Sequence, residues 1–188
     1  MIQTFEKFIL RISNLKVLSL CLFTVVVQGY FLFSRWGSHF KQLTGEKVFD
    51  LQPSLTPNQI YEQLPKYTEE AIAVYWKFVA LDYLFPVTGA LSVVLLLGIM
   101  LARGKSAIST KMLKSRVWLI PFGIIPFDWL ENTGFIFLVH NFPVKSWNLA
   151  QCTCWCKYSK MLFVFLLNGV LIIGLVTFFW ERVANRQK

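Results

Sequence analysis

Four long apolar runs constrain this chain more than any other feature of its sequence. They cover residues 15–33, 79–101, 117–139 and 161–180. An apolar run of about 18 residues or more is long enough to cross the hydrocarbon core of a bilayer as a helix. A soluble domain of 188 residues has no interior large enough to bury four such helices. We therefore predict a single all-α membrane domain over residues 1–188, built as a bundle of four transmembrane helices.

The basic residues predict which side of the membrane each connection faces. Residues 102–116 carry five basic residues and no acidic one, and short connections rich in lysine and arginine stay cytoplasmic. Basic residues also precede the first run and follow the last, so we expect both termini in the cytoplasm (N-in/C-in). Residues 34–78 then form an outer cap, and residues 140–160 form an outer loop. With its basic residues beside the spans, a chain of net charge +9 is expected to contact lipid headgroups and no nucleic acid.

Helix-start signals divide the predicted outer cap into two helices. Thr56, Pro57 and Gln59 have the spacing of a capping box with proline at the first helical position. Thr68, followed by two glutamates, predicts a second start, since acidic side chains are favourable at a helix N-terminus. This second helix is expected to run without a break into the second span. The first dozen residues predict an amphipathic helix on the inner membrane surface.

Three acidic residues lie inside the predicted spans. Asp82 is in the second, and Asp128 and Glu131 are in the third, where Asn132 follows at the i, i+4 position on the same helix face. An ionised side chain at the bilayer centre costs about 2.5–3.5 kcal/mol on insertion scales, and such residues commonly mark functional sites. The spans offer no lysine or arginine at the same depth. We therefore expect these carboxyls to be protonated, hydrated or bound to a cation.

Polar residues of the other two spans fall at a similar predicted depth. At about 1.5 Å per residue, Glu131 lies about 12 Å from the outer end of its span, Gln28 about 8 Å and Asn168 about 10 Å. These depths predict a polar pocket that opens outward. In it Glu131 is the candidate acid/base, Asp82 and Asp128 are its partners, and Asn132, Gln28 and Asn168 are binding residues. The alternative is a set of hydrogen bonds that only joins the helices.

The predicted outer loop contains three cysteines, Cys152, Cys154 and Cys156. On the oxidising side of a membrane this spacing favours a disulfide. The spacing of a zinc site is missing, so we predict no metal site.

Two segments, YWKFVALDYLFP at residues 75–86 and PFDWLENTG at residues 126–134, resemble the signature of an uncharacterised family of small four-span membrane proteins. The shared features are D-x-x-x-P opening the second helix and F-D-x-x-E-N in the third. The resemblance covers roughly residues 55–141 and does not include the cysteines. It implies a four-span architecture and points to Asp82, Asp128, Glu131 and Asn132, but it implies no reaction and no cofactor.

Three functions remain open from the sequence. The first is binding of, or acid–base chemistry on, a lipid-like molecule that enters from the outer leaflet. The second is a non-catalytic accessory or assembly role beside another membrane protein. The third is proton- or cation-coupled transport by a homo-oligomer, because four helices are few for alternating access. The sequence leaves open whether the protein is an enzyme and names no cofactor. With no obvious organelle signal, we expect the bacterial inner membrane.

Overall fold

The computed structural model describes residues 2–186 and contains four helical segments that are long and apolar enough to cross a membrane. The described residues form helices and no strand. The protein is therefore an all-α integral membrane protein, and the predicted fold class is confirmed. The four segments are Leu15–Thr44, Glu69–Arg103, Val117–Asn141 and Trp147–Val183.

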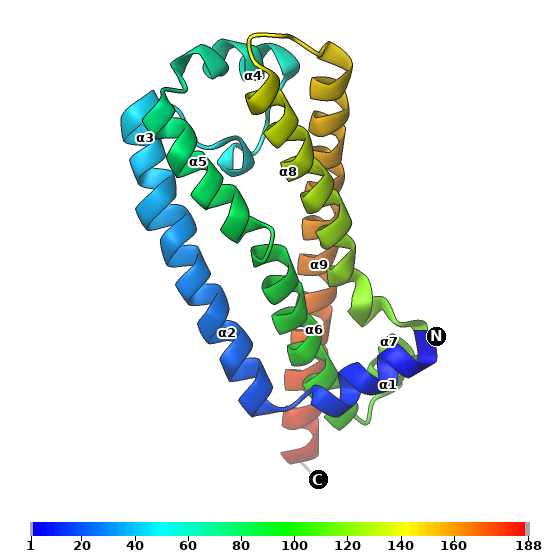
Figure 1. Ribbon diagram of the computed structural model, residues 1–188. Coiled ribbons are helices and arrows are strands. Elements are labelled where there is room, and N and C mark those ends of the chain that lie inside the picture. Colours follow the sequence, from blue (N-terminus) through cyan, green and yellow to red (C-terminus); the bar gives the residue numbers. More distant parts are fainter. Residues whose placement is uncertain (1, 187–188) are drawn as a thin grey trace.

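Most membrane segments are built from more than one helix (Figure 1). The first joins α2 (Leu15–Gly29), the π-helical η1 (Tyr30–Gly37) and α3 (Ser38–Thr44). The second joins α5 (Glu69–Asp82) and α6 (Phe85–Arg103), and the third joins the 3-10 helix η4 (Val117–Gly123) and α8 (Ile124–Asn141). The fourth lies within one helix, α9 (Trp147–Arg186).

Short helices lie at both ends of the bundle (Figure 1). At the end that carries the two termini, which we call the terminal end, they are α1 (Ile2–Ile12) and α7 (Ala107–Ser115). At the opposite end, the 45–68 segment contains η2 (Phe49–Leu51), α4 (Pro57–Gln63) and η3 (Leu64–Lys66). We call this end the cap end.

The helix starts follow the local sequence. The Thr56 side chain accepts from the Gln59 backbone N–H, and the Gln59 side chain accepts from the Thr56 backbone N–H, which completes the predicted capping box. The Thr68 hydroxyl accepts from the Ala71 N–H at the start of α5. Each pairing satisfies backbone donors that a helix N-terminus otherwise leaves unpaired. Both predicted helix starts are confirmed.

The second segment is interrupted in the middle. Helix α5 ends at Asp82, two residues follow outside the helices, and α6 begins at Phe85 with Pro86 in its first turn. Proline has no N–H to donate to the carbonyl four residues earlier, which is that of Asp82. The helix therefore breaks next to an intramembrane carboxyl.

The fourth segment corrects the predicted boundaries. Residues 147–160 were expected in the outer loop, with the span at 161–180, but the helix begins at Trp147. No glycine or proline occurs between residues 144 and 168, so nothing in this stretch interrupts a helix. A side chain at Gly134 of α8 would collide with Thr153 of α9. Glycine therefore allows the two helices to pack closely, and the first turns of α9 face α8.

The buried core changes along the bundle. At the cap end it is rich in aromatic rings, among them Phe40, Phe49, Tyr75 and Phe135. At the terminal end it is made of Ile9, Val94, Leu97, Leu101, Met112 and Trp118. Ile9 belongs to α1, so the predicted amphipathic helix packs one face against the bundle and leaves Phe5 and Phe8 exposed.

Candidate functional site

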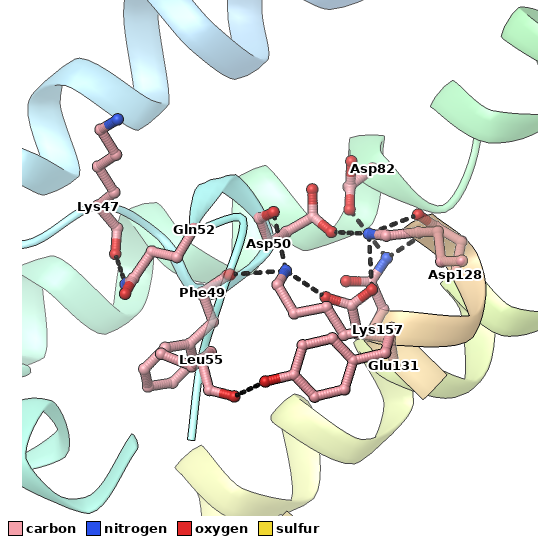
Figure 2. A network of polar contacts seen from close by, with 12 residues as sticks. Lys47, Phe49, Asp50, Gln52, Leu55, Asp82, Asp128, Glu131 and Lys157 are labelled. Carbon is pink, nitrogen blue, oxygen red and sulfur yellow. Dashed lines mark hydrogen bonds and ion pairs between the residues drawn. The ribbon is translucent and has the colours of Figure 1, made fainter. Parts of the chain in front are cut away.

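A buried polar cluster lies between α5, α8 and α9 toward the cap end (Figure 2). Asp82 ends α5, while Asp128, Glu131 and Asn132 share one face of α8, as their spacing predicted. The Asn132 side-chain amide donates to Asp82 Oδ2 at 2.8 Å and to Asp128 Oδ2 at 3.1 Å. The structure thus brings together these four predicted site residues, and Glu131 is fully buried.

Two lysines of α9 enter the cluster, which corrects the expectation that nothing basic could neutralise the acids. Lys157 Nζ lies 2.8 Å from Glu131 Oε1 and also donates to the backbone carbonyls of Phe49 and Asp50, each at 3.1 Å. The expectation failed because both lysines were assigned to an outer loop. On the helix that forms instead, they face α8.

Lys160 makes ion pairs with three carboxylates. Its ammonium group lies 3.1 Å from Asp128 Oδ1 and 2.6 Å from Glu131 Oε2, and it also pairs with the Asp50 carboxylate. Glu131 Oε2 has no hydrogen-bond partner among the described residues, so its contact with Lys160 is an ion pair. Glu131 is therefore held by two ammonium groups.

Asp50 is the fourth carboxyl of the cluster, and no pattern in the sequence pointed to it. It comes from η2, and this turn of the 45–68 segment brings it into the cluster (Figure 2). There it pairs with Lys160. Burial alone would raise the pKa of this carboxyl, but the ammonium groups of Lys160 and Lys157 hold the pKa below its ordinary value of 3.8. The ion pair therefore stabilises the fold above about pH 4, and this contribution is lost as the pH falls through the lowered pKa.

The cluster contains more carboxyls than ammonium groups. Four carboxyls, those of Asp50, Asp82, Asp128 and Glu131, meet two ammonium groups, those of Lys157 and Lys160, within the described residues. Among the described residues, no lysine or arginine lies within ion-pair distance of Asp82, whose hydrogen-bond partner is the Asn132 amide. Four ionised carboxyls would leave two uncompensated negative charges in a buried site, which is costly.

The carboxyl spacing also suits a metal ion. One oxygen from each of Asp50, Asp82 and Asp128 lies within 4.8 Å of the other two. Carboxylate oxygens are the usual ligands of hard cations such as Mg²⁺ and Ca²⁺. However, Lys160 already pairs with two of these three carboxylates. A metal ion would therefore have to displace or share the position of the Lys160 ammonium group.

The two remaining predicted binding residues lie outside the cluster. Gln28 is buried and accepts a hydrogen bond from Thr88 at 2.5 Å, which joins α2 to α6. Asn168 is exposed and donates to the Val164 carbonyl of its own helix at 2.8 Å. The expectation of one polar layer fed by all four spans is therefore wrong for these two residues. For Gln28, the structure matches the alternative of a hydrogen bond that joins helices.

The predicted disulfide is absent, because all four cysteines are free. Cys152, Cys154 and Cys156 lie within little more than one turn of α9 and not in a loop. Side chains two residues apart on a helix point to different faces, so neither neighbouring pair can meet. Cys154 is buried and Cys152 is exposed.

One residue separates the cluster from the outer surface of the bundle. Tyr83 follows Asp82, and its hydroxyl shares a hydrogen bond of 2.7 Å with Thr133, while its carbonyl accepts from the Trp129 indole at 2.8 Å. Trp129 and Leu84 are exposed at this point. The helix break therefore lies between the buried carboxyls and the surface of the membrane segments.

Comparison with known proteins finds no matching family model, no matching curated protein and no matching solved structure. The resemblance to a four-span family stays a prediction. The residues that carry it, Asp82, Asp128, Glu131 and Asn132, are all members of the buried cluster.

Proposed function

We propose that this membrane protein works by reversible binding of a proton between Asp82 and Asp128. We place it in the bacterial inner membrane with both termini in the cytoplasm, so that the cluster lies in the outer half of the bilayer. Proton exchange at this position serves proton-coupled transport or acid–base chemistry on a molecule in the membrane.

The charge imbalance of the cluster carries the proposal. The ammonium groups of Lys157 and Lys160 compensate the charge of two carboxylates. Glu131 contacts both lysines. Asp82 and Asp128 share the donor amide of Asn132. Two carboxyls this close in a site of low dielectric cannot both be ionised without a large penalty, so they share a proton or hold a cation.

The break between α5 and α6 supports the same function. Asp82 is the last residue of α5, and the C-terminal end of a helix carries a partial negative charge. Discontinuous transmembrane helices bind protons and cations at such ends in secondary transporters. Tyr83, next to Asp82 in the chain, contacts the exposed Trp129, so the break lies close to the surface of the bundle.

The contacts shift the roles expected from the sequence. Glu131 was the candidate acid/base, but it is fully buried and paired with two lysines, which suits an anchor better than a group that exchanges protons. Asp82 has no ammonium partner among the described residues and lies at the helix break, so we assign the exchange to Asp82. Asn132, a predicted binding residue, orients Asp82 and Asp128, because its amide donates to both.

An accessory role is the second candidate. It is supported by the several hydrogen bonds and ion pairs that Lys157 and Lys160 make. These contacts hold the 45–68 segment against α8 and α9 and require no proton exchange. In that case the cluster would serve only to lock the assembly, and Asp82 would be replaceable by asparagine without loss of activity.

Infrared spectroscopy of the protein in liposomes tests proton binding directly. The wild-type protein should show the carbonyl band of a protonated carboxylic acid at neutral pH, and the band should disappear when the pH is raised. Asp82→Asn should remove it, whereas Glu62→Gln, which changes an exposed acid, should leave it intact. A wild-type protein without a protonated carboxyl at neutral pH would sink the proposal, as would a band that survives in both Asp82→Asn and Asp128→Asn.

A flux assay on the same liposomes separates the two uses of the proton. A pH-sensitive dye trapped inside reports proton movement when a pH gradient is applied. Flux that requires Asp82 favours transport. A titratable band without flux favours acid–base chemistry on a lipid-like molecule, the first of the functions expected from the sequence.

A further inference from the structure

We propose that a cleft beside the polar cluster binds the anionic headgroup of a membrane lipid. The cleft lies between the cap end of the first membrane segment and the 45–68 segment, and its volume is about 350 Å³. This volume falls within the range of ligand sites. Its lining residues are Phe33, Gly37, Ser38, Lys41, Lys47 and Leu51.

The polar side of the cleft is positively charged. Lys41 and Lys47 are exposed, and among the described residues neither has a carboxylate within ion-pair distance. The neighbouring acid, Glu46, is taken by Lys66 at 2.7 Å. Two lysines without partners at one opening attract an anion such as a phosphate group.

The apolar side favours a lipid over a free anion. Phe33 is 46% exposed, and Leu51 forms the facing wall. Phe33 lies where the first apolar run of the sequence ends, so the cleft spans the boundary between the apolar run and charged residues. A lipid places its headgroup at the lysines and its glycerol and upper acyl chain against the two apolar side chains, whereas inorganic phosphate leaves the apolar side unused.

The local backbone builds this cleft. η1 is π-helical, a distortion that is frequent at functional sites. A side chain at Gly37 would lie 2.6 Å from the Leu32 carbonyl of the same segment and 3.1 Å from Leu51 Cδ1, so glycine avoids a clash within η1 and leaves room for the 49–51 turn. The Ser38 hydroxyl donates to the Phe33 carbonyl at 3.0 Å and stays on the cleft wall.

Lipid binding in the cleft would also affect the polar cluster. Lys47 and Leu51 flank Asp50 in the chain, and the Lys47 carbonyl accepts from the Gln52 side chain at 2.7 Å (Figure 2). A lipid held by Lys47 and Leu51 would therefore hold the turn that carries Asp50 to Lys160. The inference does not rest on proton binding at Asp82 and stands or falls separately.

Native mass spectrometry with equal amounts of phosphatidylglycerol and phosphatidylcholine tests the inference. The wild-type protein should retain phosphatidylglycerol preferentially. Because one lysine near a membrane surface contributes about a fivefold preference for anionic lipid, Lys41→Gln/Lys47→Gln should lower the retention about 30-fold. The matched control is Lys16→Gln/Lys145→Gln, which removes two exposed charges from outside the cleft.

A second variant tests the cleft itself without changing charge. Ser38→Phe places a bulky ring in the opening, and since Ser38 is exposed the fold should tolerate it. Retention of phosphatidylglycerol should fall at least tenfold. Equal loss in the two lysine double variants would overturn the inference, because surface charge in general would then explain the preference. Unchanged retention in Ser38→Phe would overturn it as well.

Discussion

The two halves of the second membrane segment pack in opposite ways. Helix α5 ends at Asp82 in a network of four carboxyls, two lysines and an amide, under an aromatic core. Helix α6 continues with Val94, Leu97 and Leu101, which are buried against Ile9 and Trp118. The cap-end half therefore combines an aromatic core with a network of charges, whereas the terminal half is held by apolar packing.

Apolar residues alone do not explain this fold. Inside a membrane, lipid tails are as apolar as leucine, so helix association depends on close packing and on polar contacts. A buried ion network costs desolvation energy but penalises every arrangement that leaves one member unpaired. The cap-end network can therefore fix which helix faces meet, while the terminal end contributes packing that is less specific.

The largest expected effect is at Glu131. Glu131→Gln removes the carboxylate that pairs with Lys157 and Lys160 and leaves the buried ammonium group of Lys157 with backbone carbonyls as its remaining partners. Breaking a buried pair in this way costs about 3–5 kcal/mol. Reversible unfolding in mixed detergent micelles measures the loss. The exposed Glu62→Gln serves as the matched control, and a loss below about 1 kcal/mol at Glu131 would show that the cap end is not held by charge.

The terminal half should respond to cavities instead. Leu97 is fully buried, and Leu97→Ala should lower the free energy of unfolding by about 2 kcal/mol. This is the low end for such changes, because a side chain inside a membrane loses packing contacts but no hydrophobic free energy of transfer from water. The infrared carboxyl band should be unchanged. Leu162→Ala, at a position that is 57% exposed, is the control. A shift of the band in Leu97→Ala would contradict the separation of the two halves.

The apolar runs and the local capping signals are the features that the sequence predicted well. Four runs of sufficient length can form little else in a membrane, and the capping signals at Thr56 and Thr68 are local, so both helix starts were confirmed. The start of α9 was missed. The polar residues of its first turns resemble a loop in composition, although no glycine or proline interrupts them.

The candidate site was predicted only where its residues share one helix. The helical spacing of Asp128, Glu131 and Asn132 is visible in the sequence itself, so their common face could be predicted. Lys157 and Lys160 have the same i, i+3 spacing as Asp128 and Glu131. If the predicted fourth span had begun earlier, this spacing could have indicated that the two lysines pair with the two acids. Asp50 could not be found this way, because its place depends on how an irregular segment folds over the bundle.

Tyr67 gives a smaller test within the cap end. Its ring packs against those of Phe40 and Phe49, and its hydroxyl is buried without a hydrogen-bond partner among the described residues. Tyr67→Phe removes this unpaired group without a cavity, so we expect a gain of about 1 kcal/mol in the free energy of unfolding. A loss of stability at neutral pH would mean that the hydroxyl has a partner.

The same substitution has a pH dependence of known sign. Burial raises the pKa of Tyr67 well above its usual value of 10, with the charge of Glu46 adding to the effect. The folded protein then keeps the phenol proton when the unfolded chain has lost it, so this contribution to stability is complete below about pH 10 and declines as the pH rises further. Unfolding measured across this range should decline less steeply for Tyr67→Phe than for wild type.

The smallest effect should come from the ion pair at the terminal end. Glu6 of α1 lies 2.9 Å from Arg116, but 40% of the Arg116 side chain is exposed, so water and salt screen the pair. Glu6→Gln should cost at most about 1 kcal/mol, and the cost should disappear at high salt. Glu131→Gln should keep its cost at the same salt concentration, because its partners Lys157 and Lys160 are buried. If salt abolished both effects alike, the cap-end cluster would be open to solvent, and the contrast between a charged, sealed half and an apolar half of this bundle would fail.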